Sequence, residues 1–229
     1  MKLPAALHDW DIDTQAAAAV QRELAGRIIR RGKLDKLRFV AGVDCAFPSE
    51  GRECLAAAII WDMQDECVVE EQHAVTPTLF PYIPGFLSFR EAPAILAALE
   101  KVQHRVDMLM FDGHGIAHPR RLGIASHVGL LCDMPSVACA KSRLIGMHAE
   151  PGPQRGSRTQ LLTRDGEELG AVLRTRDNVK PVFVSIGHKT SLDEAVNVVL
   201  RCGRGLRLPE PTRLADKRVA EIKKDLARN

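Results

Sequence analysis

The sequence predicts an α/β fold built on one mixed sheet, in which an antiparallel meander is joined to parallel strands and helices cover the faces. Two observations lead to this prediction. Three segments of β type follow one another with short connections, which is typical of an antiparallel meander. Continuous apolar runs then alternate with helical patterns, as expected for strands buried on both faces. Since no long linker interrupts the 229 residues, we expect a single domain over residues 1–229.

A helix is predicted near the N-terminus, before the meander. Asp13 and Thr14 can cap its start, and Gly32 is expected to end it. Its apolar face consists of three residues at helical spacing, namely Val20, Leu24 and Ile28. The strands of the meander are expected at residues 37–44, 54–61 and 67–74, with a polar turn at 62–66.

The rest of the chain alternates between helical and strand patterns. Residues 76–84 are rich in proline, which excludes an interior strand there. Helices are expected from Ser88, over 122–132, after the capping box of Ser191 and Glu194, and after Pro211. Buried strands are expected at residues 106–111, 136–140, 168–173 and 182–186. Residues 148–158, which combine glycine, proline and charge, are expected to form a loop.

The composition is that of a globular protein. Hydrophobic residues make up 45% of the chain and charged residues 27%, which suits a buried core surrounded by water. No apolar stretch reaches the roughly 20 residues that span a bilayer. The N-terminus lacks a signal pattern, so a cytoplasmic location is expected. The six cysteines contain no C-x-x-C pair and support neither a zinc knuckle nor a disulfide framework.

The net charge of +3 does not by itself indicate a nucleic-acid partner. Basic residues cluster between Gly26 and Arg38 and again from Arg204 to the last residue. Such clusters can follow phosphates and release counterions. Solvated helix faces have the same composition, so both interpretations stay open.

Three acids stand out by their positions. Asp44 ends the predicted strand in V-A-G-V-D, Asp112 ends the buried strand in M-L-M-F-D, and Glu91 lies in the predicted helix after G-F-L-S-F-R. Open α/β sheets place their sites at the edge where strands end. Three carboxylates there would need a cation, and oxygen ligands of this kind favour Mg²⁺ or Mn²⁺ over zinc. For each acid alone a helix cap or a turn acid is the favoured interpretation, but the glycines beside Asp44 and Asp112 favour close approach of a ligand.

Five sequence segments together resemble one known family. They are V-A-G-V-D, P-Y-I-P-G-F-L-S-F-R-E, D-G-H-G-I-A-H-P-R-R-L-G-I-A-S-H-V-G, A-K-S-R-L and L-P-E-P-T-R-L-A-D. In these segments, and in their order from about Arg38 to about Asp216, the chain resembles the endonuclease V family. The second and third segments are long, which makes the resemblance specific.

The resemblance implies an RNase H-like fold with a metal-dependent active site. Asp44, Glu91 and Asp112 match the family's catalytic, metal-binding carboxylates, and Lys141 matches its catalytic lysine. The ammonium group of this lysine could orient water or offset charge at the scissile phosphate. Asp216 stands where the family has His or Asp to complete the metal site. The implied cofactor is Mg²⁺, which Mn²⁺ could replace.

The resemblance also implies a strand-separating wedge and a pocket for a base. The wedge consists of Pro81, Tyr82, Ile83 and Pro84. Its two prolines stiffen a loop whose apolar side chains could replace lost base stacking; a proline turn with Tyr82 packed on the core is the alternative. Glycines in the pocket could leave backbone groups free to distinguish hypoxanthine from adenine. The implied pocket residues are Gly85, Leu87, Gly113, His118, Gly123 and Ile124.

Several basic residues are candidates for substrate contacts. Arg90, Arg120 and Arg121 could bind phosphates, with solvated surface as the alternative for each. His118 could act in the pocket or be a structural histidine. For His188, which follows a predicted strand, the structural interpretation is favoured over a phosphate contact.

The implied activity is that of an endonuclease in DNA repair. It would recognise a deaminated base such as hypoxanthine in DNA and hydrolyse the second phosphodiester bond 3′ to it, leaving 3′-hydroxyl and 5′-phosphate ends. The expected partner is DNA, with RNA left open, and no membrane; a monomer is expected.

The alternatives are an inosine-specific ribonuclease, a structure-selective RNase H-like nuclease, an inosine-binding module and a metal phosphatase for small molecules. The wedge and pocket segments disfavour the structure-selective nuclease. Lys141 together with the three acids disfavours a module that only binds.

Overall fold

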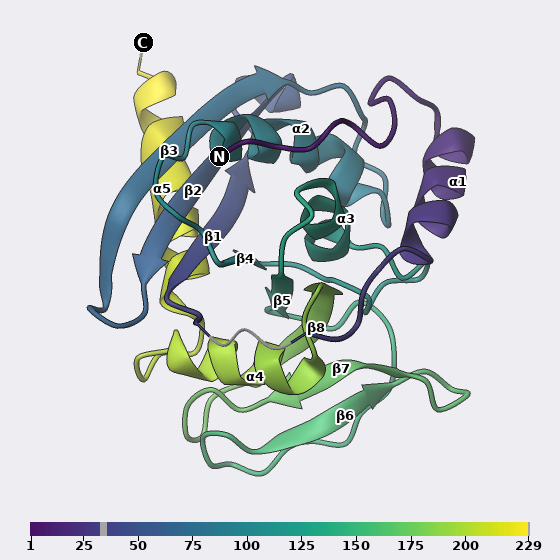
Figure 1. Cartoon of the computed structure of the whole chain (residues 1–229), viewed down its shortest axis with the longest axis vertical. Helices are drawn as coiled ribbons and strands as arrows, with labels where there is room; N and C mark the ends of the chain where they lie inside the picture. The colour runs from purple at the N-terminus through teal and green to yellow at the C-terminus, as the bar shows by residue number, and fades with distance from the viewer. Residues whose placement is uncertain (33–35, 229) are drawn as a thin grey trace.

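One mixed sheet of eight strands organises the part of the chain that the structure describes (Figure 1). The computed structural model describes residues 1–32 and 36–228. The order across the sheet is β3-β2-β1-β4-β5-β8-β7-β6. The strands are β1 Phe39–Ala46, β2 Glu53–Asp62, β3 Cys67–Pro77, β4 Met108–Phe111, β5 Ser136–Ala140, β6 Arg158–Leu162, β7 Glu168–Leu173 and β8 Val182–His188.

The pairing directions confirm the predicted fold class, an RNase H-like mixed sheet. β1, β2 and β3 form the antiparallel meander. β4 pairs parallel to β1, and β5 pairs parallel to β4. β8, β7 and β6 continue the sheet with antiparallel pairs. β6 was not predicted, because this edge strand has only two apolar residues and gives no buried-strand pattern.

Helices cover both faces of the sheet (Figure 1). α2 and α3 pack on one face, and α4 and α5 pack on the other. In the described residues no helix combines the length and the apolar composition needed to cross a membrane. The helices are α1 Thr14–Ala25, α2 Leu87–Glu100, α3 Ile124–Leu131, α4 Leu192–Arg201 and α5 Glu210–Leu226, with a short 3-10 turn, η1, at Ser49–Gly51.

Successive residues of β1 belong to two different cores. Ala41 and Val43 lie in the core under α2 and α3, whereas Val40 lies in the core under α4. All three side chains are at most 2% exposed. Both faces of the central strands are therefore covered, which explains their continuous apolar sequence.

Side-chain caps fix the starts of α1 and α4 as predicted. The Asp13 carboxylate accepts a hydrogen bond from the Ala16 N–H at 2.8 Å, and the Ser191 hydroxyl accepts one from the Glu194 N–H at 3.2 Å. The prediction that the first helix continues to Gly32 is wrong, because α1 ends at Ala25. The apolar spacing misleads here, since the segment beyond the helix also packs against the core.

Gly42 in β1 allows α5 to pack directly on the sheet. A Cβ atom at this position would lie 2.1 Å from the carbonyl carbon of Pro211 and 2.5 Å from its Cβ. The glycine beside Asp44 was expected to admit a ligand, and that expectation is wrong, because the backbone that approaches it belongs to α5. This close packing brings Asp216 of α5 close to Asp44 of β1, where it contributes to the raised pKa of Asp44.

Gly42→Ala is expected to destabilise the fold by about 1–3 kcal/mol, because the added methyl group must displace backbone atoms of Pro211. Urea denaturation followed by circular dichroism measures this change in the free energy of unfolding. Gly26→Ala is the control, since its Cβ would lie 3.5 Å from the Glu23 carbonyl oxygen, an ordinary contact. Equal stability of the two variants would contradict the packing role of Gly42.

Candidate active site and adjoining cavity

The ends of β1, β4 and β5 bring three of the predicted catalytic residues to one edge of the sheet. Parallel pairing aligns Val43 of β1 with Phe111 of β4. Asp44 and Asp112 are the next residues along these chains, so the two carboxylates lie beside each other. Lys141 is the first residue after β5, the neighbour of β4.

Lys141 forms an ion pair with Asp112, with 2.6 Å between Nζ and Oδ2. Desolvation lowers the pKa of Lys141, but the hydrogen bond to Asp112 and the charges of Asp112, Asp216 and Asp44 outweigh it and raise the pKa above its usual value. The ammonium group is therefore charged at neutral pH. It offsets part of the negative charge that gathers at this edge.

Asp44 and Glu91 have strongly raised pKa values. Burial raises the pKa of Asp44 to about 7; the charges of Asp112 and Asp216 act in the same direction, and a hydrogen bond from the Cys45 N–H opposes them. Burial also raises the pKa of Glu91, in α2, to about 8, and the charge of Asp44 adds to this. Asp44 is therefore close enough to Glu91, Asp112 and Asp216 for their negative charges to repel its own.

These carboxylates suit a hard divalent cation. Carboxylate oxygens are the ligands that Mg²⁺ and Mn²⁺ prefer, and a cation would relieve the repulsion between Asp44, Glu91, Asp112 and Asp216. Over residues 1–32 and 36–228, no three His, Cys, Asp or Glu side chains are already gathered as a metal cage. Instead, Lys141 holds the Asp112 carboxylate.

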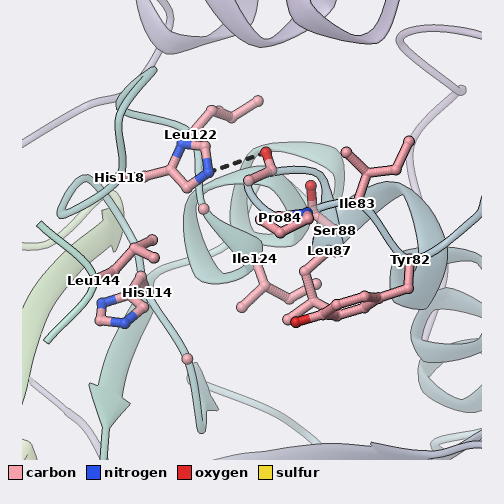
Figure 2. A pocket seen from close by; sticks show the side chains of 13 residues that line it. Tyr82, Ile83, Pro84, Leu87, Ser88, His114, His118, Leu122, Ile124 and Leu144 are labelled. Carbon is pink, nitrogen blue, oxygen red and sulfur yellow. Dashed lines mark hydrogen bonds between the residues drawn. The ribbon is translucent and has the colours of Figure 1, made fainter. Parts of the chain in front are cut away.

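A cavity of about 180 Å³ begins one residue beyond Asp112 (Figure 2). Figure 2 shows Tyr82 and Ile83 on one side of it and His114 and His118 on the other. The lining includes every residue predicted for the base pocket and three of the wedge residues. These are Tyr82, Ile83, Pro84, Gly85, Leu87, Gly113, His118, Gly123 and Ile124. Pro81 and Arg90, also predicted for substrate, lie outside the lining that the described residues form.

The cavity has four further lining residues that the sequence analysis did not assign to it: Ser88, His114, Leu122 and Leu144. His114 had a usable signal, because it follows Asp112 in D-G-H-G. Ser88 and Leu122 were predicted only as helix starts. Leu144 arrives from the segment after β5, and no local pattern indicates that it reaches this cavity.

Hydrogen bonds fix His118 as a neutral ring. The Arg120 N–H donates to Nδ1 at 3.2 Å, so Nε2 carries the hydrogen and donates to the Gly85 carbonyl oxygen at 3.1 Å, as the dashed line in Figure 2 marks. Burial, with the nearby charge of Arg120, lowers the pKa of His118 to about 4. The ring is therefore an uncharged donor at neutral pH, and it holds the turn at Gly85.

The backbone groups of two pocket glycines are already engaged. The Gly85 carbonyl oxygen accepts hydrogen bonds from three side chains, those of Gln21, His118 and Arg120. At Gly123, the N–H donates to the Gly115 carbonyl oxygen, and the Gly123 carbonyl oxygen accepts from the backbone N–H of His127. The expectation of free glycine groups is therefore wrong for the Gly85 carbonyl and for both backbone groups of Gly123. Gly85 has a φ of 82°, so the turn itself favours glycine there.

The three arginines predicted to bind phosphate all have partners within the chain. The Arg90 guanidinium carbon lies 4.3 Å from the ring centroid of Phe47. That of Arg120 lies 4.2 Å from the ring centroid of Phe86. Arg121 forms an ion pair with Glu167 at 2.5 Å. These contacts give each residue a structural role, and their phosphate contacts stay predictions.

His188 is a buried structural histidine, with 1% of its surface exposed. Its Nδ1 accepts a hydrogen bond from the Ile29 N–H at 3.3 Å, and its Nε2 lies 3.6 Å from Asp133. This environment supports the structural interpretation and leaves little access for a phosphate.

A nearly buried arginine anchors the loop at residues 148–158. Arg174 donates hydrogen bonds to the Glu150 carboxylate at 2.7 Å and to the backbone oxygens of Pro151 and Gly152 at 2.9 and 3.0 Å. The loop thus has a defined framework that its composition did not predict.

Known proteins match the chain over most of its length. The family model for Endonuclease V matches residues 22–217. An endonuclease V from Trichormus variabilis is 51% identical over 92% of this chain and 95% of its own length. An endonuclease V from Methanothrix thermoacetophila is 50% identical over 92% of each chain.

Solved structures match the fold as well as the sequence. The crystal structure of the endonuclease V from Streptomyces avermitilis is 41% identical, with a TM-score of 0.90 over 95% of this chain and 96% of that one. The Ciona intestinalis endonuclease V, crystallised with a 23mer DNA containing an inosine followed by a ribo-adenosine, is 26% identical. Its TM-score is 0.82 over 94% of this chain and 100% of that one.

Asp44→Asn is expected to stabilise the metal-free protein at pH 8. Because the folded-state pKa is raised to about 7, ionisation of Asp44 costs stability above the ordinary carboxyl pKa, and the amide removes this cost. The gain should exceed about 1 kcal/mol, or about 2–4 °C in Tm, and should shrink as the pH falls toward 4. Thermal unfolding in EDTA measures it, with the exposed Asp165→Asn as control. A lower Tm for Asp44→Asn at pH 8 would contradict the repulsion.

Proposed function

The chain belongs to the endonuclease V family and is therefore a nuclease, and from this premise we propose that it cuts DNA next to deaminated bases. It would recognise hypoxanthine and hydrolyse the second phosphodiester bond on its 3′ side, leaving 3′-hydroxyl and 5′-phosphate ends. Its role would be DNA repair, and it would act as a monomer in the cytoplasm. The Ciona intestinalis relative in complex with inosine-containing DNA supports this choice of substrate.

The observation that carries the proposal is the position of the cavity relative to the carboxylates. Asp112 stands at the active edge, the edge of the sheet where Asp44, Asp112 and Lys141 meet. The next two residues, Gly113 and His114, already line the cavity. A base held in the cavity therefore keeps its own strand within reach of the carboxylates. This arrangement suits an enzyme that inspects a base and cuts the backbone nearby.

The residues at the active edge divide the chemistry among them. Asp44, Glu91, Asp112 and Asp216 would hold Mg²⁺, which when bound supplies Lewis-acid activation of water and of the phosphate. Lys141 is charged and close to Asp112, so its ammonium group can stabilise negative charge that develops on the scissile phosphate.

The first turn of α2 can recognise the base edge. The first N–H groups of a helix have no intrahelical acceptors. In α2 the N-cap residue Phe86 offers no side-chain acceptor in their place. Leu87 and Ser88 of this turn line the cavity. These N–H donors fit the O6 acceptor of hypoxanthine and would oppose the N6 amino group of adenine, which is itself a donor.

Tyr82 is placed to act as a wedge in the duplex. Its side chain is 70% exposed beside the cavity, so it is not the core tyrosine of the alternative interpretation. An exposed aromatic ring at this position could stack on the base left behind when the lesion leaves the helix. An inosine-specific ribonuclease is the second candidate, because the DNA in the Ciona intestinalis complex carries a ribo-adenosine after its inosine.

Duplex DNA with one deoxyinosine should be nicked in Mg²⁺ one nucleotide beyond the lesion, and an undamaged duplex should stay intact. Asp44→Ala should lower the rate by at least about 10²-fold, because it removes a predicted metal ligand. Asp165→Ala, which changes an exposed turn acid, should cut normally. End-labelled substrates on a denaturing gel measure the rate and position. Equal cutting of the undamaged duplex would favour the structure-selective nuclease instead.

Tyr82→Ala should slow cutting of the inosine duplex about tenfold, and it should slow cutting of a single-stranded inosine oligonucleotide much less. The reason is that base–aromatic stacking contributes about 1–3 kcal/mol, and only the duplex must be opened. Leu79→Ala is the matched control, because Leu79 is 55% exposed and lies outside the lining of the cavity. The same slowing on both substrates would rule out a wedge and indicate a general binding defect.

A further inference from the structure

A chain of hydrogen bonds leads from the N-terminal segment to the wall of the cavity. Ser88 lines the cavity and is 2% exposed. Its Oγ lies 3.0 Å from Nδ1 of His127, and Nε2 of His127 lies 2.8 Å from Nε2 of His8. Nδ1 of His8 lies 2.7 Å from the backbone oxygen of Asp9. The proposed mechanism gives none of these side chains a role.

For a neutral His8 ring, the Asp9 carbonyl determines the direction of every hydrogen bond in this chain. A carbonyl oxygen can only accept, so Nδ1 of His8 carries the hydrogen. In a neutral His8 ring Nε2 is then an acceptor, and Nε2–H of His127 must donate to it. Nδ1 of His127 is left as an acceptor, and it can only receive the hydroxyl hydrogen of Ser88.

The surroundings of His127 support a neutral, immobile ring. His127 is completely buried, and burial, with a smaller effect of His8, lowers the pKa of His127 to about 3. The ring of Trp10 lies 4.5 Å from that of His8, and the ring of Phe89 lies 5.0 Å from that of His127, both between centroids. This enclosure leaves little room for water to replace a partner in the chain.

The Ser88 hydroxyl therefore has no hydrogen to offer the cavity. Its single hydrogen is bound to His127, so a ligand that reaches Oγ can meet only its lone pairs. A base edge that meets this oxygen must bring a donor. N1 of hypoxanthine carries a hydrogen, whereas N1 of adenine is an acceptor and would leave two acceptors facing each other in a buried site.

We propose that Ser88 is a specificity-determining residue, and that His8 and His127 are positioning residues that hold its hydroxyl as an acceptor for the N1–H of a deaminated purine. This inference rests on the proposed function, since it assumes that the cavity takes the base. It adds a side-chain acceptor to the backbone donors at the start of α2. A donor beside an acceptor matches the O6 and N1–H of hypoxanthine together.

The direction of the chain can be tested without any substrate. Nitrogen-15 NMR of the histidine-labelled wild-type protein distinguishes the two neutral tautomers, with His127 assigned through bonds from its backbone. At pH 8 we expect His127 to carry its hydrogen on Nε2. A hydrogen on Nδ1 would overturn the proposal, because Ser88 would then be free to donate to the cavity.

The role of Ser88 can be tested by steady-state cutting of the deoxyinosine duplex in Mg²⁺. Ser88→Ala should raise KM about tenfold, the effect of one lost hydrogen bond, and should change kcat little. Ser126→Ala is the matched control, since Ser126 is a buried serine of α3 that bonds to Ile186 outside the cavity lining. His8→Ala should resemble Ser88→Ala, whereas His8→Gln, whose amide oxygen can accept from His127, should restore most of the wild-type KM.

The possible outcomes distinguish a failure of this inference from a failure of the proposed function. An active wild type with an unchanged KM in Ser88→Ala would overturn the inference and leave the proposed function intact. A Ser88→Ala variant that fails to fold is replaced by the His8 pair, whose equal KM values would overturn the inference. A wild type that ignores inosine would refute the proposed function itself, and with it the assignment of N1–H as the donor.

Discussion

The parallel pairing of β1 with β4 is the constraint on which the rest of the arrangement depends. Since parallel strands end at the same edge, the register that aligns Val43 with Phe111 places Asp44 beside Asp112. Both strands are buried on both faces, so a shift of this register would disturb two cores at once. Gly42 lets α5 approach the same strand and adds Asp216 to the edge.

This arrangement brings like charges together where the fold gains nothing from them. The raised pKa values of Asp44 and Glu91 show that their ionised forms are disfavoured in the folded chain. The ion pair between Lys141 and Asp112 offsets only part of the repulsion. The well-covered sheet must supply the rest, which is the usual relation between a rigid scaffold and a destabilising functional site. The electrostatic cost is thus borne by residues that have no part in the chemistry.

Most of the sheet and the active edge could be predicted, because their signals are local. An apolar run that ends in an acid identifies a buried strand and its exposed end, as at Asp112. Caps such as Asp13 and Ser191 mark helix starts for an equally local reason. The failures involve contacts between distant segments. Neither the end of α1, nor the packing of Pro211 on Gly42, nor the partners of the Gly85 carbonyl can be inferred from neighbouring residues.

The polarity of the cavity is a further property that local sequence cannot specify. A hydroxyl group can rotate and a neutral imidazole has two tautomers, so a lining side chain has a fixed polarity only if a second partner determines it. For His118 that partner is the Arg120 N–H, and for Ser88 the chain through His127 and His8 ends at the Asp9 carbonyl. Both end at backbone groups, which cannot exchange donor for acceptor.

Because the hydrogen bonds from Ser88 end at His8 and Asp9, base selectivity can change through the N-terminal segment. The family match begins at residue 22, so Ser88 and His127 lie within it, whereas His8 and Asp9 lie before it. The residues that line the cavity therefore lie in the matched part of the chain. The Asp9 carbonyl, which sets the polarity of Ser88, lies in the segment before it. A change at His8 can alter which base edge the cavity accepts without altering its walls. Ser88 and the predicted metal ligand Glu91 thus share helix α2, and hydrogen bonds through His127 connect this helix to the N-terminal segment.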